Sequence, residues 1–134
     1  MIGYSTVGTN DLDRARAFYD ALLGELGGKR LMEFGENGFT LYGTGMSRPG
    51  LAVTRPYDGK EARPGNGTMI ALAADSRAKV DAVHARAMAL GGSDEGAPGL
   101  RSPEGEQAFY GAYFRDLDGN KLCAFCIGGG VAEG

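Results

Sequence analysis

The sequence contains no tryptophan, one histidine and two cysteines among its 134 residues. A site that needs two or more imidazole ligands is therefore excluded, such as a three-histidine zinc site or a facial triad. Cys123 and Cys126 are too few for a disulfide framework, and no second Cys-x-x-Cys pair completes a structural zinc site. Residues three apart on a strand point to opposite faces, so these two side chains are not placed to pair with each other. We therefore expect two buried thiols in a reducing compartment.

An excess of basic charge is also lacking, since 14 Lys and Arg stand against 17 Asp and Glu and give a net charge of −3. A nucleic-acid partner is not expected, because such proteins need a basic face. No run approaches the ~20 apolar residues of a membrane span, and the first residues do not resemble a signal peptide. We therefore expect a soluble, cytoplasmic protein without a membrane partner. Its length suits one domain.

Hydrophobic periodicity predicts the elements of the first half of the chain. Alternation predicts a strand over Ile2–Gly8, and Asn10 and Asp11 offer acceptors for the N-terminus of a helix. An apolar stripe predicts that helix over about 12–26, ended by a Gly-Gly pair. Three further strands are predicted at Lys29–Glu33, Phe39–Tyr42 and Leu51–Thr54.

The same pattern returns 65 residues later, where Met69 takes the place of Tyr4. The second half is expected to contain a strand at Thr68–Ala73, a helix at about Ser76–Leu90, and strands at Gly111–Arg115 and Lys121–Ile127. Neither half has elements enough to bury both faces of its sheet, so we expect the two halves to share one core. The predicted organisation is one α+β domain of two paired βαβββ modules. Module one covers about 1–56, a linker about 57–66, module two about 67–127, and a flexible tail 128–134.

Two stretches carry a family resemblance. Residues 10–19, Asn-Asp-Leu-Asp-Arg-Ala-Arg-Ala-Phe-Tyr, begin the first helix, and residues 110–122 contain the turn Asp-Leu-Asp-Gly-Asn. Together with the duplicated pattern they resemble the glyoxalase/bleomycin resistance protein/extradiol dioxygenase superfamily, also called vicinal oxygen chelate, over nearly the whole chain. The resemblance implies curved mixed sheets with the helices outside.

The resemblance also implies where a metal would bind. Metal-dependent members of this superfamily hold a divalent ion with ligands from the first and last strands of the modules. The matching positions here are Tyr4, Ala52, Met69 and Cys123. Hard divalent ions prefer carboxylate and imidazole donors, and none of these residues supplies one. We therefore expect that the chain does not bind the divalent ion of its metal-dependent relatives and has no cofactor.

Several residues are candidates for a binding or catalytic site in the cleft that the resemblance implies. Tyr4, Met69 and Cys123 would either contact a ligand or simply fill the vacated space. Tyr113 is a candidate acid or hydrogen-bond donor. Arg101 and Arg55 would bind an anion, whereas the acidic loop residues would act as bases or bind a cation; these are Glu33, Glu104 and Glu106. His84 falls on the second helix and is expected to be a half-buried structural side chain.

The leading expectation for function is a metal-free protein that binds or sequesters a small molecule in the cleft, and Arg101 would favour an anionic end of that molecule. The alternative is a lyase, isomerase or dioxygenase-like enzyme that uses Tyr4, Tyr113 or Cys123 for proton transfer. A third possibility is a protein–protein module with a collapsed cleft. A homodimer is also expected, because the resemblance implies it and closed two-fold dimers are common.

Overall fold

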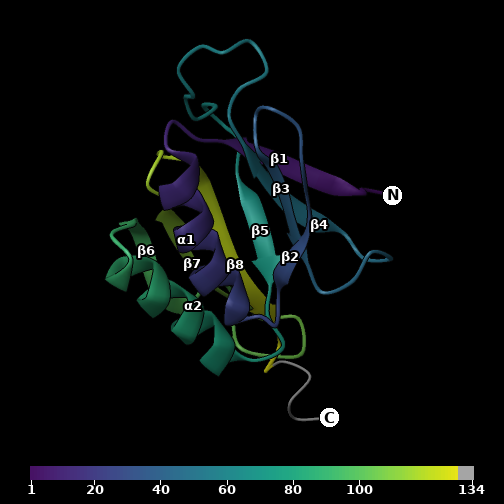
Figure 1. Cartoon of the computed structure of the whole chain (residues 1–134). Coiled ribbons are helices and arrows are strands. Elements are labelled where there is room, and N and C mark those ends of the chain that lie inside the picture. Colours follow the sequence, from purple (N-terminus) through teal and green to yellow (C-terminus); the bar gives the residue numbers. More distant parts are fainter. Residues whose placement is uncertain (130–134) are drawn as a thin grey trace.

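A computed structural model of the chain describes residues 1–129 (Figure 1). Within them the chain forms two modules of one helix and four strands each. The first module consists of β1 (Tyr4–Gly8), α1 (Leu12–Gly24), β2 (Lys29–Phe34), β3 (Phe39–Gly43) and β4 (Gly50–Thr54). The second consists of β5 (Ile70–Ala73), α2 (Arg77–Ala89), β6 (Ser93–Leu100), β7 (Phe109–Arg115) and β8 (Lys121–Ile127). None of these helices is long and apolar enough to cross a membrane.

The two modules have the same sheet topology. Sheet A has the strand order β1-β4-β3-β2, and sheet B has the order β5-β8-β7-β6. In each sheet the first strand pairs in parallel with the last, and the remaining pairs are antiparallel. Both sheets are therefore mixed, and the predicted α+β fold of paired βαβββ modules is confirmed.

A capping side chain stabilises the N-terminus of each helix. The side chain of Asp11 accepts a hydrogen bond from the backbone N–H of Arg14, and Ser76 does the same for Lys79. These caps lie 65 residues apart, which is the predicted offset of the repeat. Asn10 has a different role, because its side-chain amide bonds both the N–H and the C=O of Ala62 and so fixes the linker to the start of α1.

The duplicated βαβββ pattern predicts three strands after the second helix, but the sequence analysis assigned residues to only two of them and did not locate β6. Its sequence, Ser-Asp-Glu-Gly-Ala-Pro-Gly-Leu, has no alternation of apolar residues and holds two glycines and a proline. The strand lies at the edge of sheet B and pairs with β7 through a register that shifts twice. Its position at an edge tolerates the proline, which cannot donate to a ladder.

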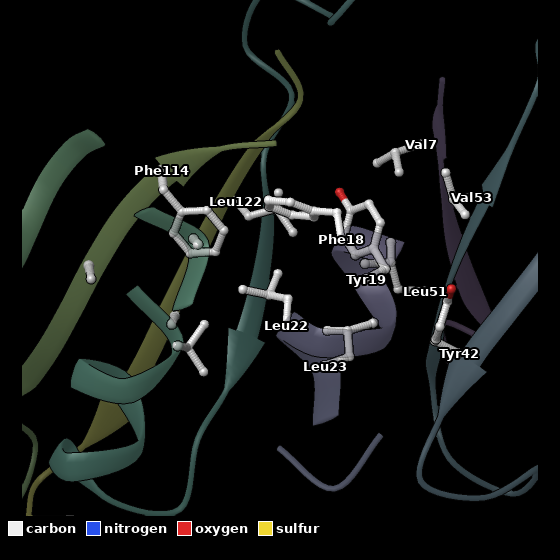
Figure 2. Close-up of a cluster of buried hydrophobic side chains, with 14 of the residues drawn as sticks. Val7, Phe18, Tyr19, Leu22, Leu23, Tyr42, Leu51, Val53, Phe114 and Leu122 are labelled. Carbon is white, nitrogen blue, oxygen red and sulfur yellow. The ribbon is translucent and has the colours of Figure 1, made fainter. Parts of the chain in front are cut away.

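A single hydrophobic core joins the two modules, as expected, and α1 lies at its centre (Figure 2). Phe18 and Leu22 point toward Leu122 and Phe114 of the second module, while other side chains of α1 pack on sheet A. Helix α2 lies alongside α1 and covers sheet B. The large apolar side chains of this core are almost completely buried, so the shared core holds the modules together.

Each sheet has a second face that turns away from its helix, here called the open face. Because side chains alternate along a strand, the residues next to core positions lie on the open face. Cys123 lies on the open face of sheet B, between Leu122 and Ala124, whereas Cys126 belongs to the core. Both are free and buried, so the prediction of two buried thiols on opposite faces is confirmed.

A connecting segment separates the last strand of the first module from the first strand of the second. Strand β4 ends at Thr54 and β5 begins at Ile70, and no helix or strand lies between them. Gly128, the first residue of the predicted flexible tail, is hydrogen-bonded at its N–H to Ala108 and at its C=O to Arg77. Residues 130–134 of that tail lie outside the described residues.

Candidate functional site

Three of the predicted site residues come together on the open face of sheet B. Tyr113 of β7 is paired directly with Cys123 of β8. The guanidinium carbon of Arg101, just beyond β6, lies 5.5 Å from the centre of the Tyr113 ring. Lys121, which the sequence analysis did not single out, places its ammonium group 5.6 Å from the same ring. We refer to Arg101, Tyr113, Lys121 and Cys123 as the Tyr113 site.

The thiol of Cys123 forms the floor of the Tyr113 site. The whole Cys123 residue is 0% exposed. Burial raises the pKa of the Cys123 thiol, although a hydrogen bond with Tyr113 and the charges of Arg101 and Lys121 oppose that rise. A thiol in this state is mostly protonated at neutral pH and makes a poor nucleophile.

Both cations of the Tyr113 site keep donors that no protein group uses. Arg101 donates through Nη2 to the carbonyl of Ala97 at 2.6 Å, and it has no carboxylate partner among residues 1–129. Lys121 has neither a hydrogen bond nor an ion pair within the described part of the chain. By contrast Arg115, which follows on the same face, is neutralised by Glu95 at 3.3 Å. The site therefore carries local positive charge in an acidic protein.

Apolar surface lies beside these cations. The rings of Phe109 and Phe125 stack with their planes 4° apart and their centres 5.3 Å apart, and both lie on the open face of sheet B. The next strand, β5, presents the small side chains of Ala71 and Ala73 on this face, and both are exposed. Small residues beside stacked rings leave room for an apolar guest.

Tyr4 lies elsewhere, on the open face of sheet A. Its residue is 56% exposed, and its ring meets that of Phe39 edge-on at 5.6 Å. Phe39 in turn packs against Phe34, which is 62% exposed. We call Tyr4, Phe34 and Phe39 the aromatic patch. Within this chain Tyr4 is thus not part of the Tyr113 site.

Met69 lies just before β5 and is 42% exposed. It lines a groove of about 730 Å³ between the modules, which is also lined by Leu23 of α1 and by Leu26, just after that helix. Tyr4, Tyr113, Cys123 and Arg101 do not line this groove. Cys123, Tyr4 and Met69, which were expected in one cleft, therefore lie in three places: the Tyr113 site, the aromatic patch and the groove, respectively.

The other candidates are engaged in structural contacts or lie in solvent. Glu33 pairs with Arg16 and Arg30, and Glu104 pairs with Arg77. Arg55 makes one long hydrogen bond to a loop carbonyl, and Glu106 is an exposed loop residue.

The imidazole of His84 is buried on α2, as expected of a structural side chain. It packs edge-on against Phe114 and lies 3.0 Å from the carboxylate of Asp94. A backbone hydrogen bond from Gly96, together with His84, lowers the pKa of Asp94. These contacts explain the role of His84 without any part in a site on the open faces.

The residues present do not fit the metal that the fold family implies. Tyr4 and Ala52 belong to sheet A, whereas Met69 precedes sheet B and Cys123 lies within it. A thioether, a protonated thiol and a phenol are weak ligands for a hard divalent ion. Among residues 1–129 no three His, Cys, Asp or Glu side chains come close enough to hold a metal ion.

Comparisons with known proteins identify the family and the fold. No match was found among curated proteins. A glyoxalase/bleomycin resistance protein from Albidiferax ferrireducens T118 is 38% identical, with a TM-score of 0.81 over 94% of this chain and 98% of that one.

Two more distant structures share the fold alone. A glyoxalase/bleomycin resistance protein/dioxygenase family enzyme from Burkholderia phytofirmans PsJN is 17% identical, with a TM-score of 0.69 over 93% of this chain and 97% of that one. The V278E mutant of glyoxalase I from Zea mays is 20% identical, with a TM-score of 0.70 over 92% of this chain and 43% of that one. Residues 1–124 match the family model described as Glyoxalase/Bleomycin resistance protein/Dioxygenase superfamily. This chain therefore belongs to the Glyoxalase/Bleomycin resistance protein/Dioxygenase superfamily.

Proposed function

We propose that this protein binds a small molecule with an anionic group at the Tyr113 site, without the metal of its metal-dependent relatives. The observation that carries the proposal is the placement of two cations, Arg101 and Lys121, over the ring of Tyr113. A guanidinium fork and an ammonium group with free donors suit a carboxylate, sulfonate or phosphate.

The apolar part of the ligand would lie against the stacked rings of Phe109 and Phe125 and the exposed alanines of β5. Such an arrangement is typical of small-molecule sites, in which apolar surface supplies most of the affinity and a few polar groups fix the orientation. The hydroxyl of Tyr113 provides a further polar contact. The preferred ligand is therefore an aromatic or amphiphilic molecule with one anionic end.

An enzyme that moves a proton through Tyr113, Tyr4 or Cys123 is the alternative. Two observations favour binding over that alternative. Cys123 is buried with a raised pKa, so little thiolate is present near neutral pH. Tyr4 is on the other sheet and its nearest aromatic neighbour is Phe39, so it brings no acid or base to Cys123.

The proposal is tested with anilinonaphthalene sulfonate, a fluorescent probe that carries both aromatic rings and an anionic group. We expect Arg101→Met to weaken probe binding about tenfold or more, because hydrogen bonds to charged groups contribute about 1.5–3 kcal/mol. Arg55→Met, which removes an exposed arginine outside the Tyr113 site, is the control and should bind as the unchanged protein does. Equal affinities for the two variants would contradict the proposal.

Native mass spectrometry of the purified protein tests the metal-free part separately. We expect no stoichiometric manganese, iron, nickel, zinc or magnesium and, where a ligand copurifies, the added mass of an organic anion. One equivalent of metal that disappears in Cys123→Ala or Tyr4→Phe would show that the family site persists in another form.

A further inference from the structure

A small polar pocket lies where β1 approaches the start of β5, at the junction of the two modules. Its volume is about 130 Å³. The pocket is separate from the groove that Met69 lines, and it belongs to neither the Tyr113 site nor the aromatic patch, although Lys121 borders both this pocket and the Tyr113 site. The polar side chains that line it are Thr6, Arg63, Thr68, Asn120 and Lys121.

The charge at this junction pocket is entirely positive. Arg63 comes from the linker and Lys121 from the start of β8, and none of the described Asp or Glu residues lines the pocket. Within residues 1–129 neither cation has a carboxylate partner or a hydrogen-bond acceptor. Asp118, in the turn before Lys121, is turned to the start of α1, where it accepts from the N–H of Asn10 and lies 3.7 Å from Arg14. The two positive charges are therefore left uncompensated.

Hydroxyl groups complete the polar lining. The hydroxyls of Thr6 and Thr68 make no hydrogen bond to the described residues, so both can donate into the pocket. Gly65 is necessary for this arrangement, since a Cβ at that position would lie 2.5 Å from the hydroxyl oxygen of Thr68. The amide of Asn120 is held by its bonds to Gly8 and Asp116, which fixes one wall.

We propose that the junction pocket binds a small oxyanion, such as phosphate or the phosphate group of a larger ligand. Two cations and two free hydroxyls, with no competing carboxylate, supply the donors that such an anion needs. The pocket takes residues from the first module, the linker and the second module. An anion bound there would link the three segments and stabilise their pairing.

Thermal unfolding in inorganic phosphate tests this site, with sodium chloride at matched ionic strength as the reference. A ligand that binds only the folded state raises the Tm in a saturable way. Exclusion of phosphate from the surface also raises the Tm, but that effect does not saturate and is the same for every variant. We expect a saturable rise of the Tm in the unchanged protein and in the control variant Lys60→Met. That substitution removes a neighbouring linker charge outside the pocket.

The same saturable shift should be lost in Arg63→Met and reduced at least tenfold in apparent affinity in Thr68→Val. Both positions are exposed, so the variants should fold. Identical shifts in all variants would overturn the proposal, because the effect would then be a general salt effect. Glycerol phosphate in place of phosphate distinguishes the two sources of the anion, since tighter binding of the ester would indicate the phosphate group of a larger ligand.

The result is separable from the proposed binding at the Tyr113 site, which shares only Lys121. Arg101→Met should keep the phosphate shift and lose probe binding, whereas Arg63→Met should do the reverse. A phosphate shift that is lost in Arg101→Met and kept in Arg63→Met would place the anion at the Tyr113 site and overturn the junction pocket. Loss of probe binding in Arg63→Met as well would contradict the separation of the two sites.

Discussion

The hydroxyl of Tyr19 donates a hydrogen bond to Oδ2 of Asp116 at 2.5 Å, across the boundary between the modules. Tyr19 belongs to α1, and Asp116 begins the turn between β7 and β8. The other oxygen of Asp116 accepts from the backbone N–H groups of Asp118 and Asn120, and the amide of Asn120 reaches back to the carbonyl of Gly8. The two stretches that carry the family resemblance thus meet at one buried carboxylate.

Tyr19→Phe should destabilise the protein by about 1–3 kcal/mol, because it leaves a buried carboxylate with one donor fewer. The free energy of unfolding in urea measures the effect. Tyr57→Phe is the matched control, since Tyr57 is 96% exposed and its hydroxyl has no such role. Equal stabilities of the two variants would mean that the bond contributes nothing to the pairing.

Alkaline pH should remove the contribution of Tyr19. Burial, and then the charge of Asp116, raise the pKa of Tyr19 well above its ordinary value. A phenol whose pKa is higher in the folded state stabilises the fold fully below the unfolded value of about 10 and loses that contribution above it. The difference in unfolding free energy between the unchanged protein and Tyr19→Phe should be constant from about pH 7 to 9 and shrink above about 10. A difference that grows with pH would contradict this sign.

Met69→Trp should leave the melting temperature nearly unchanged, because the side chain it enlarges is 42% exposed at the rim of the groove. Leu122→Trp is the contrasting variant, since Leu122 is 0% exposed and overpacking of a core costs about 1–3 kcal/mol or more. A drop in the melting temperature of Met69→Trp as large as that of Leu122→Trp would show that Met69 is a core residue.

The thiol of Cys123 should react slowly in the folded protein. Burial raises its pKa and denies access to reagents, so labelling with Ellman's reagent at neutral pH should proceed far more slowly than in urea. The Cys126→Ala variant isolates the signal of Cys123. Complete labelling of the folded variant within the mixing time would restore Cys123 as a candidate catalytic nucleophile.

We also predict a homodimer that covers the aromatic patch. Phe34 and Tyr4 are exposed on an open sheet face, and clustered apolar side chains of this kind are typical of interaction sites. Light scattering should give twice the chain mass of 14.0 kDa, and Phe34→Glu should shift the protein to the monomer. Met46→Glu changes an exposed methionine outside the patch and should stay dimeric. A monomer at all micromolar concentrations would refute the prediction.

Most of the fold could be predicted because its signals are local. The caps at Asp11 and Ser76 and the apolar stripe of α1 can be read from short stretches of sequence, and the repeat follows from comparing two such stretches 65 residues apart. Strand β6 could not, since its residues have little preference for a strand and its pairing with β7 is a tertiary effect.

The candidate site could be predicted only in part. The sequence places Tyr113 across the last hairpin from Cys123, and the structure pairs the two residues directly. Lys121 was missed, although it lies on the same face as Cys123, two residues earlier on one strand. Which residues of the two sheets share a face with one another depends on how the modules pack. The sequence therefore predicts one shared cleft for Tyr4 and Cys123, whereas the structure places them on different sheets.

The position of α1 inside the shared core has a consequence for how the duplication is understood. In linear repeat proteins each unit adds its own stability and contacts only its neighbours, so a unit can be removed or added. Here Phe18 and Leu22 of the first unit find their partners at Leu122 and Phe114 of the second. A fragment that ends at the linker would expose these side chains to water. The duplication therefore repeats the topology of the module but does not give two modules that are stable on their own. The chain is expected to fold and unfold as a single cooperative unit.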